Sequence, residues 1–268
     1  MICKNCKRLL PNQINYCTGC GAKVIRNRLT FRNLIEDFSE RFLNYDNTFL
    51  KTIIHLFTKP ENVIDSYING TRKKYVNAIS YFAIALTFAG LQMYVITKFF
   101  PEAMDFSTYN PNSSKIETDT QNKVLEFTRE YQSIIMMFYI PFYALISKIT
   151  FFNIKKYNYT EHLVIYIYTQ AQVTIVGFVF TIAALLLGVP FMYIGFVMLP
   201  LMVIYIAYCL KRLYNLSFPS IILRTLFFSL IFGVFLVIFI AVATGIYLYN
   251  GGLETIKEAA KEAQKVNS

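Results

Sequence analysis

The residues of this chain best suited to chemistry are cysteines, and four of the five lie within the first 20 residues. They form two Cys-x2-Cys pairs separated by ten residues: Cys3 with Cys6, and Cys17 with Cys20. Four thiolates at about 2.3 Å from a Zn²⁺ ion complete its tetrahedral coordination. The spacing therefore predicts a zinc ribbon over residues 1–25. Because a full set of thiolates leaves no position for a catalytic water, we expect the zinc to be structural.

Disulfide bonds and iron binding are the other uses of such cysteines. No apolar signal-peptide core precedes the first pair in the opening sequence MICKNCKRLL, so we expect the N-terminus to remain in the cytoplasm. Paired cysteines in that reducing compartment are more often metal ligands than disulfides. Iron suits the same sulfur ligands and stays open as an alternative. Since about 25 residues bury too little surface to sustain a fold, metal binding is expected to supply the folding free energy.

The rest of the chain has the composition of a membrane protein. Hydrophobic residues make up 55% of the 268 residues and charged residues only 16%, whereas soluble domains carry roughly 25% charged residues. The apolar residues fall in runs close to the ~20 residues that a helix needs to cross a bilayer. We therefore predict an all-α membrane protein with a five-helix transmembrane bundle over residues 78–249. The predicted spans are residues 78–96, 133–152, 163–187, 191–210 and a segment within 222–249.

The distribution of charge predicts how these spans are oriented. Residues 1–77, 148–162 and 211–224 each carry more Lys and Arg than Asp and Glu, whereas loop 97–132 is net negative and the tail 250–268 is neutral. Positively charged loops stay on the cytoplasmic side. We therefore expect a multi-pass protein of the cytoplasmic (inner) membrane, with a cytoplasmic N-terminus and an extracytoplasmic, helical C-terminal tail. The net charge of +10 is thus largely a signature of topology.

Residues 26–77, between the ribbon and the first span, have the pattern of amphipathic helices. Apolar residues recur at helical spacing in two stripes: Phe31, Leu34, Ile35, Phe38 and Phe42, then Phe49, Leu50, Ile53, Ile54 and Phe57. Pro60 marks the start of a third short helix and Gly70 its end. Such helices can lie in the lipid interface or pack on the cytoplasmic face of the bundle, and the sequence favours neither arrangement.

Basic residues gather where the chain enters the first span. Arg72, Lys73 and Lys74 are suited to lipid phosphates, and Tyr75 suits the aromatic belt at the membrane interface. The simpler interpretation is that the first cytoplasmic flank of any span is basic. Residues 1–32 also carry seven basic residues and no acidic one. This favours contact with anionic lipid or a protein partner over nucleic acid, because no aromatic stacking platform accompanies the charge.

The sequence contains no constellation that we recognise as catalytic, and we expect no enzyme activity. No Asp or Glu lies within a predicted span, although ionisable groups there usually mark transport or proton relay. Polar side chains concentrate on the third span instead, at Thr169, Gln170, Gln172 and Thr174. We expect them to hydrogen-bond neighbouring helices; the alternative is that they line a polar cavity.

The first 85 residues resemble a bacterial family of uncharacterised zinc-ribbon membrane proteins. The resemblance rests on the CxxC…YCxxCG ribbon and on the later segment TKPENVIDSYINGTRKKYVNAISYF. That segment is similar to the Pro-x2-Val-Ile…Tyr-Ile-x-Gly-x-Arg-x2-Tyr signature of the family. The resemblance implies that the signature residues matter without giving them a role: Pro60, Tyr67, Gly70, Arg72 and Tyr75. The layout of five spans is also similar to that of Yip-type membrane proteins, in topology alone.

Two functions from different classes are therefore expected. The first is a non-catalytic membrane adaptor or scaffold, in which the ribbon is a docking module for a cytoplasmic protein. The second is a carrier or lipid-handling protein that uses the bundle, and an unrecognised membrane enzyme is the remaining alternative. The absence of carboxylates from the predicted spans favours the adaptor, with the lipid bilayer and a cytoplasmic protein as its partners.

Overall fold

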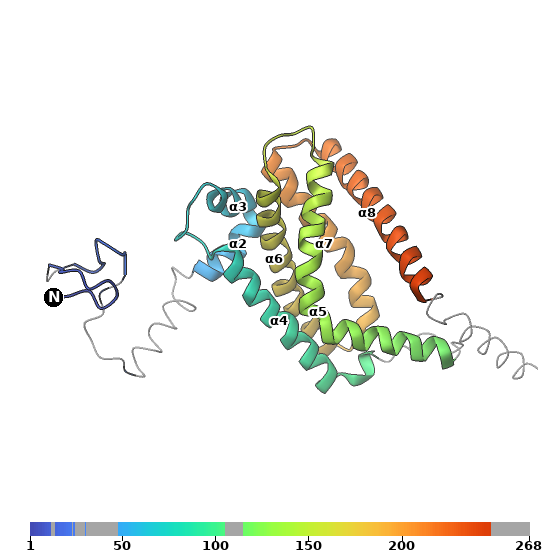
Figure 1. Cartoon of the computed structure of the whole chain (residues 1–268). Helices are drawn as coiled ribbons and strands as arrows, with labels where there is room; N and C mark the ends of the chain where they lie inside the picture. Colours follow the sequence, from blue (N-terminus) through green and yellow to red (C-terminus); the bar gives the residue numbers. More distant parts are fainter. Residues whose placement is uncertain (12–13, 23, 25–29, 31–47, 105–114, 248–268) are drawn as a thin grey trace, which may run out of the picture. The chain divides into compact units, whose positions relative to one another are not determined.

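The computed structural model describes residues 1–11, 14–22, 24, 30, 48–104 and 115–247. The chain divides into two compact units, Met1–Thr48 and Phe49–Ser268, each of which is described by itself (Figure 1). The apolar stripe predicted within residues 31–42 and the tail 250–268 lie outside the described residues.

Five helices of the larger unit are long and apolar enough to cross a membrane, which confirms the predicted all-α membrane bundle. They are α4 (Ala78–Phe99), α5 (Lys115–Thr150), α6 (Tyr159–Leu186), α7 (Phe191–Tyr214) and α8 (Phe218–Tyr247). In α5 the apolar stretch is confined to Glu130–Thr150. Outside the helices, the described residues include an isolated β-bridge between Ile2 and Leu9, and they form no strand.

Asparagines set several ends of the spans. The Asn77 side chain accepts a hydrogen bond from the backbone N of Ser80 at 2.9 Å, at the start of α4. Asn158 and Glu161 form a reciprocal capping box at the start of α6, which satisfies two backbone N–H groups that a helix otherwise leaves unpaired. At the end of α7, Asn215 has φ 51°, a left-handed conformation that asparagine tolerates. The short turns at these ends fold successive helices back on one another.

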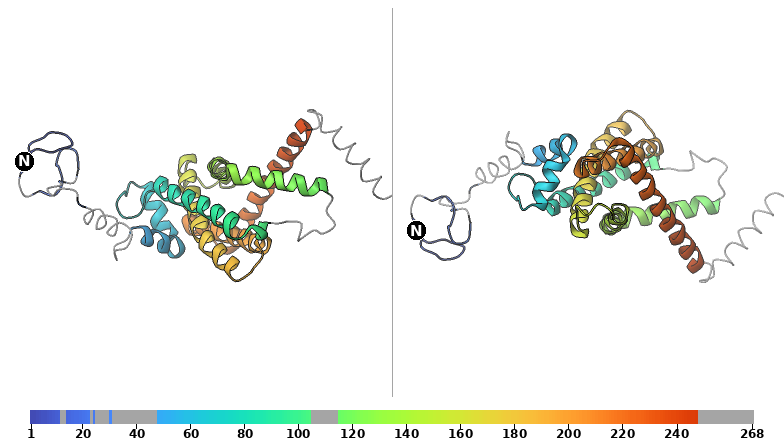
Figure 2. Two further views of the ribbon diagram at one scale, coloured as in Figure 1. Left: turned by 90° about the horizontal axis from the view of Figure 1, so that it is seen from below. Right: turned by 90° about the horizontal axis from the view of Figure 1, so that it is seen from above.

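Helix α6 is the central element of the bundle and contacts α4, α5 and α7. Its N-terminal half buries Ile165, Tyr166, Tyr168 and Ala171. Helix α8 contacts α5 and α7 and runs along the outside of the bundle (Figure 2). Most of its apolar side chains are exposed, as suits a helix whose surface faces lipid.

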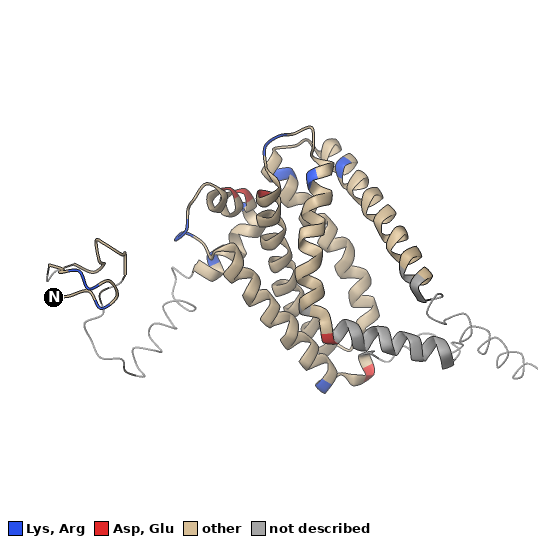
Figure 3. Ribbon diagram, in the orientation of Figure 1, with Lys and Arg blue, Asp and Glu red and all other residues tan. Residues whose placement is uncertain are grey.

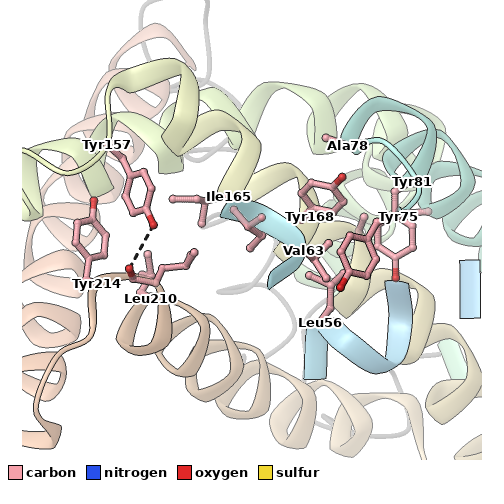
Figure 4. Close-up of a cluster of buried hydrophobic side chains, with 14 of the residues drawn as sticks. Leu56, Val63, Tyr75, Ala78, Tyr81, Tyr157, Ile165, Tyr168, Leu210 and Tyr214 are labelled. Carbon is pink, nitrogen blue, oxygen red and sulfur yellow. Dashed lines mark hydrogen bonds between the residues drawn. The ribbon is translucent and has the colours of Figure 1, made fainter. Parts of the chain in front are cut away.

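The short helices α2 (Thr48–Thr58) and α3 (Pro60–Ile68) pack on the bundle. Leu56, Val63 and Ile64 are each 0% exposed. They lie in one apolar cluster with Tyr81 of α4 and Tyr168 of α6 (Figure 4). The sequence left open whether these helices lie in the lipid interface or pack on the bundle. In the structure, α2 and α3 pack on the bundle.

The segments predicted to be cytoplasmic meet at one end of the larger unit. Lys156, in the turn between α5 and α6, pairs with Asp65 of α3 at 3.8 Å. Arg212, at the end of α7, pairs with Glu61 of α3. Figure 3 shows Lys and Arg gathered at this end of the bundle. The side of the membrane that this end faces remains a prediction.

Candidate functional site

The sulfurs of the four N-terminal cysteines converge on one point. Their Sγ atoms all lie within 4.8 Å of one another. The distance is 3.7 Å between Cys3 and Cys20, and 3.6 Å between Cys6 and Cys17. In a tetrahedral site with metal–sulfur bonds of about 2.3 Å, neighbouring sulfurs are about 3.8 Å apart. The cluster therefore has the dimensions of a four-thiolate metal site, which zinc and iron both accept.

Two matching backbone turns position these cysteines. In the first, Lys7 N donates to Cys3 O at 2.9 Å, and in the second, Gly21 N donates to Cys17 O at 2.8 Å. The residue that follows each pair is left-handed, with φ 60° at Lys7 and 69° at Gly21. Glycine adopts this conformation without strain, whereas a residue with a Cβ pays about 1–2 kcal/mol. The sequence indicated the turn at Gly21, but the equivalent turn at Lys7 carries no glycine to mark it.

Hydrogen bonds favour the thiolate form in the second turn. The backbone N–H groups of Cys20 and Gly19 lower the pKa of Cys17. Hydrogen bonds from the Asn5 side chain and the Ala22 backbone lower the pKa of Cys20 to about 6. Because the thiolate is the metal-binding form of cysteine, the lowered pKa values of Cys17 and Cys20 favour metal binding at this turn.

The apolar core of this unit is small. Among the described residues, Cys3, Cys17 and Leu10 are buried together, and Ile14 and Val24 pack against them. Two of the three buried residues are themselves cluster cysteines, so little apolar surface is left to stabilise the turns. The donor set thus fits a metal that contributes to folding.

The basic segment before α4 makes internal contacts and also exposes charge. Arg72 Nη1 donates to Tyr67 O, and its guanidinium carbon lies 4.3 Å from the centroid of the Tyr67 ring. Tyr75 is 7% exposed, and its hydroxyl lies 2.7 Å from His55 Nδ1. Lys73 and Lys74 are exposed. Arg72 and Tyr75 therefore help to hold the connection between α3 and α4, and contact of this segment with lipid headgroups remains a prediction.

The polar residues predicted on the third span lie on α6, and one of them links three helices. Gln172 accepts a hydrogen bond from the Tyr81 hydroxyl of α4. Its Nε2 donates to Ile53 O of α2 at 3.1 Å. The expected bonding between helices is present here, and it reaches the short helix α2 as well as a neighbouring span.

The other three polar residues of α6 have different surroundings. Thr169 and Thr174 donate to carbonyls of their own helix, Ile165 O and Gln170 O, at 3.0 Å each. Gln170 Nε2 lies 4.0 Å from Met202 Sδ. Gln170 Oε1 is buried, with no hydrogen-bond partner in the part of the chain that the structure describes. The four residues therefore do not act as one cluster.

Tyrosines that the sequence did not single out bind the backbone around α2 and α3. The hydroxyls of Tyr205 and Tyr208 on α7 donate to Leu56 O and Thr58 O of α2, at 3.2 Å each. From α6, the Tyr168 hydroxyl donates to Val76 O at 2.7 Å. Helices α6 and α7 thus hold α2 and the connection between α3 and α4 by main-chain carbonyls.

The Leu56 carbonyl shows why such a donor is needed. In a continuing helix it would accept from the N–H of residue 60, but that residue is Pro60, which has no N–H. Leu56 is fully buried, so water does not supply a donor. Pro60 was the sequence signal for this contact. A proline four residues after Leu56 leaves the Leu56 carbonyl without its helical donor, so another group must supply one.

Comparison with known proteins identifies one matching segment. Residues 46–90 match the model of a family described as a protein of unknown function (DUF3667). The matched segment contains α2, α3 and the first half of α4, and the four-cysteine cluster lies outside it. A search of curated proteins and a search of solved structures find no match.

Proposed function

We propose that this protein is a non-catalytic membrane adaptor or scaffold, with a structural zinc ribbon that docks a cytoplasmic partner. The observation that carries the proposal is the four-cysteine cluster, whose sulfurs lie 3.6–3.7 Å apart across the two turns. Four thiolates saturate a tetrahedral zinc ion, which then neither activates water nor polarises a substrate. A small domain built in this way presents a surface without supplying chemistry.

The division of the chain supports the same proposal. The cluster belongs to the unit Met1–Thr48, whereas α2 from its second residue onward and α3 to α8 belong to the unit Phe49–Ser268. Within the larger unit, Gln172, Thr169 and Thr174 form hydrogen bonds with other groups of the bundle. The internal hydrogen bonds of these three side chains suit an anchor better than a solute pathway.

Removal of the ribbon tests the adaptor. In a deletion of residues 2–25, the bundle should stay folded and membrane-inserted, while a cytoplasmic protein that co-purifies with the full chain in fixed stoichiometry should be lost. The double variant Cys6→Ser/Cys17→Ser should lose the same protein, and Cys209→Ser, which alters a buried cysteine of α7, should retain it. Collapse of the bundle on deletion would make the ribbon a part of the membrane fold. An activity lost with association unchanged would refute docking.

A carrier or lipid-handling function is the second candidate. The observation in its favour is a cavity of about 310 Å³ among α4, α5, α6 and α7. Its polar lining comprises Gln92, Gln132, Thr174 and Thr181. A solute that co-purifies with the bundle in fixed stoichiometry, and that Thr174→Phe removes, would favour this function over the adaptor.

A further inference from the structure

A separate cavity of about 390 Å³ lies among α5, α6, α7 and α8. Its wall is mostly apolar and includes Met202, Ile206 and Phe228. The residues of α8 that line it run from 221 to 232, about 16 Å along the helix axis at 1.5 Å per residue. The volume lies within the range of about 300–1,000 Å³ that is usual for ligand sites, and its extent along α8 suits a hydrocarbon chain.

Arg224 is the charged residue of this lining. Its Nη1 donates to Thr150 O at 2.9 Å, and its Nη2 donates to Asn153 Oδ1 at 3.0 Å. The guanidinium carbon lies 4.9 Å from the centroid of the Phe151 ring. These contacts fix the guanidinium at the C-terminal end of α5, at the mouth of an apolar space.

The hydrogen bonds of Arg224 leave part of its binding capacity unused. A guanidinium has five N–H donors, and Nε is buried with no hydrogen-bond partner among the described residues. The carbonyl end of α5 offsets part of the positive charge. A planar fork of N–H groups is the arrangement that binds phosphate with two parallel hydrogen bonds.

Arg224 also lacks a carboxylate partner in the described part of the chain. The ion pairs at this end of the bundle involve Lys156 with Asp65 and Arg212 with Glu61. A cation that is partly withdrawn from water gains from a countercharge. The described residues provide no carboxylate for Arg224, so an anion from outside the chain fits the site.

We propose that this cavity binds one anionic phospholipid, with its phosphate on Arg224 and one acyl chain along α8 toward Phe232. Through Thr150 and Asn153, Arg224 lies at the same end of the bundle as the turn between α5 and α6, where lipid headgroups meet a spanning helix. Phe232 lies about two turns further along α8. Lys148, at the end of α5, and Lys155, in the turn that follows, lie two positions in sequence from Thr150 and Asn153, the partners of Arg224. This positive charge favours an anionic headgroup over a zwitterionic one. The inference concerns the bundle alone and does not depend on the docking role of the ribbon.

The test compares lipids on the full-length protein in detergent. Phosphatidylglycerol, phosphatidylcholine with the same acyl chains, and inorganic phosphate are each titrated, with the shift in Tm and the lipid retained in native mass spectrometry as readouts. We expect one phosphatidylglycerol per chain, at least tenfold weaker binding of phosphatidylcholine, and no effect of inorganic phosphate at the same concentrations. Equal binding of the two lipids, or an equal effect of phosphate alone, would overturn the proposal without the use of any variant.

Variants then locate the site. Arg224→Gln should weaken phosphatidylglycerol binding about tenfold, the size of one charged hydrogen bond. Val203→Phe, which fills the cavity from α7, should also weaken binding while Arg224 is kept. The matched control is Lys211→Gln, which removes one positive charge from the same end of the bundle outside the cavity lining, and it should bind like the native chain. Unchanged binding in Arg224→Gln or in Val203→Phe would place the lipid elsewhere and refute the assignment.

Discussion

Single side chains in this protein bring polar groups to places where water is scarce. Tyr81 and Tyr168 are both 0% exposed, and their hydroxyls donate to Gln172 Oε1 and Val76 O. Tyrosine suits this task because its ring is apolar and its tip is polar. At the cysteine cluster, backbone N–H groups likewise donate to the sulfur of Cys17, which binds a metal as a thiolate. Both sites depend on individual donors, so single substitutions should reveal them.

Loss of one cluster cysteine should abolish metal binding. We expect one metal ion per chain for the native protein and well below one for Cys6→Ser, because three thiolates cannot complete a structural tetrahedral site. Elemental analysis of purified protein measures the ratio and identifies the metal. Cys209→Ser, outside the cluster, should keep the full ratio. Full metal content in Cys6→Ser would argue against the four-cysteine site.

His55 should make the stability of the larger unit depend on pH. Burial lowers the pKa of His55, and the charges of Lys51, Lys59 and Lys74 lower it further. The unfolded chain therefore takes up the proton first, near its ordinary pKa of 6.5. The folded state loses stability as pH falls below about 6.5 and is unaffected above it. Thermal unfolding between pH 5 and 8 should show a smaller loss of Tm at low pH for His55→Gln, and identical pH profiles would contradict this.

At the scale of elements, α2 and α3 behave as part of the bundle. Their apolar residues join the main core cluster, and groups from α6 and α7 hold their backbone. Ion pairs join α3 to Lys156 in the turn between α5 and α6 and to Arg212 at the end of α7. The segment that matches a family of unknown function thus contains both short helices that pack on the spans. We expect changes that release α2 to destabilise the whole bundle.

Removal of the Tyr205 hydroxyl tests this attachment. Tyr205→Phe leaves the buried Leu56 carbonyl without its donor, which should cost about 1–3 kcal/mol of stability. Thermal or denaturant unfolding in detergent measures the loss. Tyr208→Phe is the matched control, because its bond to Thr58 O is exposed and water can replace it, so a smaller loss is expected. Equal stability of Tyr205→Phe and the native chain would show that the hydroxyl does not hold α2.

At the scale of the whole molecule, the distribution of charge and the arrangement of helices agree. The turn between α5 and α6, the turn between α7 and α8, and α3 share one end of the bundle. If all five helices cross the membrane, the segments before α4 and after α8 are predicted to lie on opposite sides. The excess of Lys and Arg predicts that the shared end faces the cytoplasm.

Cysteine labelling in intact cells tests this topology. Ser217→Cys, in the turn between α7 and α8, should react with a membrane-impermeant thiol reagent only after permeabilisation. Ser113→Cys and Ser268→Cys should react in intact cells, because both positions are predicted to be extracytoplasmic. The native chain provides the background from its own cysteines. Labelling of Ser217→Cys in intact cells would overturn the predicted orientation.

Much of the fold followed from the sequence because its signals are local. The hydropathy of 20-residue runs indicated all five membrane-length helices. Helix α4 begins at the predicted residue, Ala78, whereas α6 begins four residues earlier than predicted, directly after its capping residue Asn158. The two Cys-x2-Cys pairs indicated the sulfur cluster, since each pair sets its own turn geometry. Which metal fills it, which partner it meets and which side of the membrane it faces remain predictions.

The tertiary structure alone decided how distant segments share their polar groups. The bond from Gln172 to Ile53 O spans 119 positions, and that from Tyr205 to Leu56 O spans 149. The cavity at Arg224 likewise forms only where α5, α6, α7 and α8 meet. Local spacing fixes which residues share a turn or a helix. Which sides of two helices contact each other depends on how the side chains along both helices pack. No local sequence pattern contains that information.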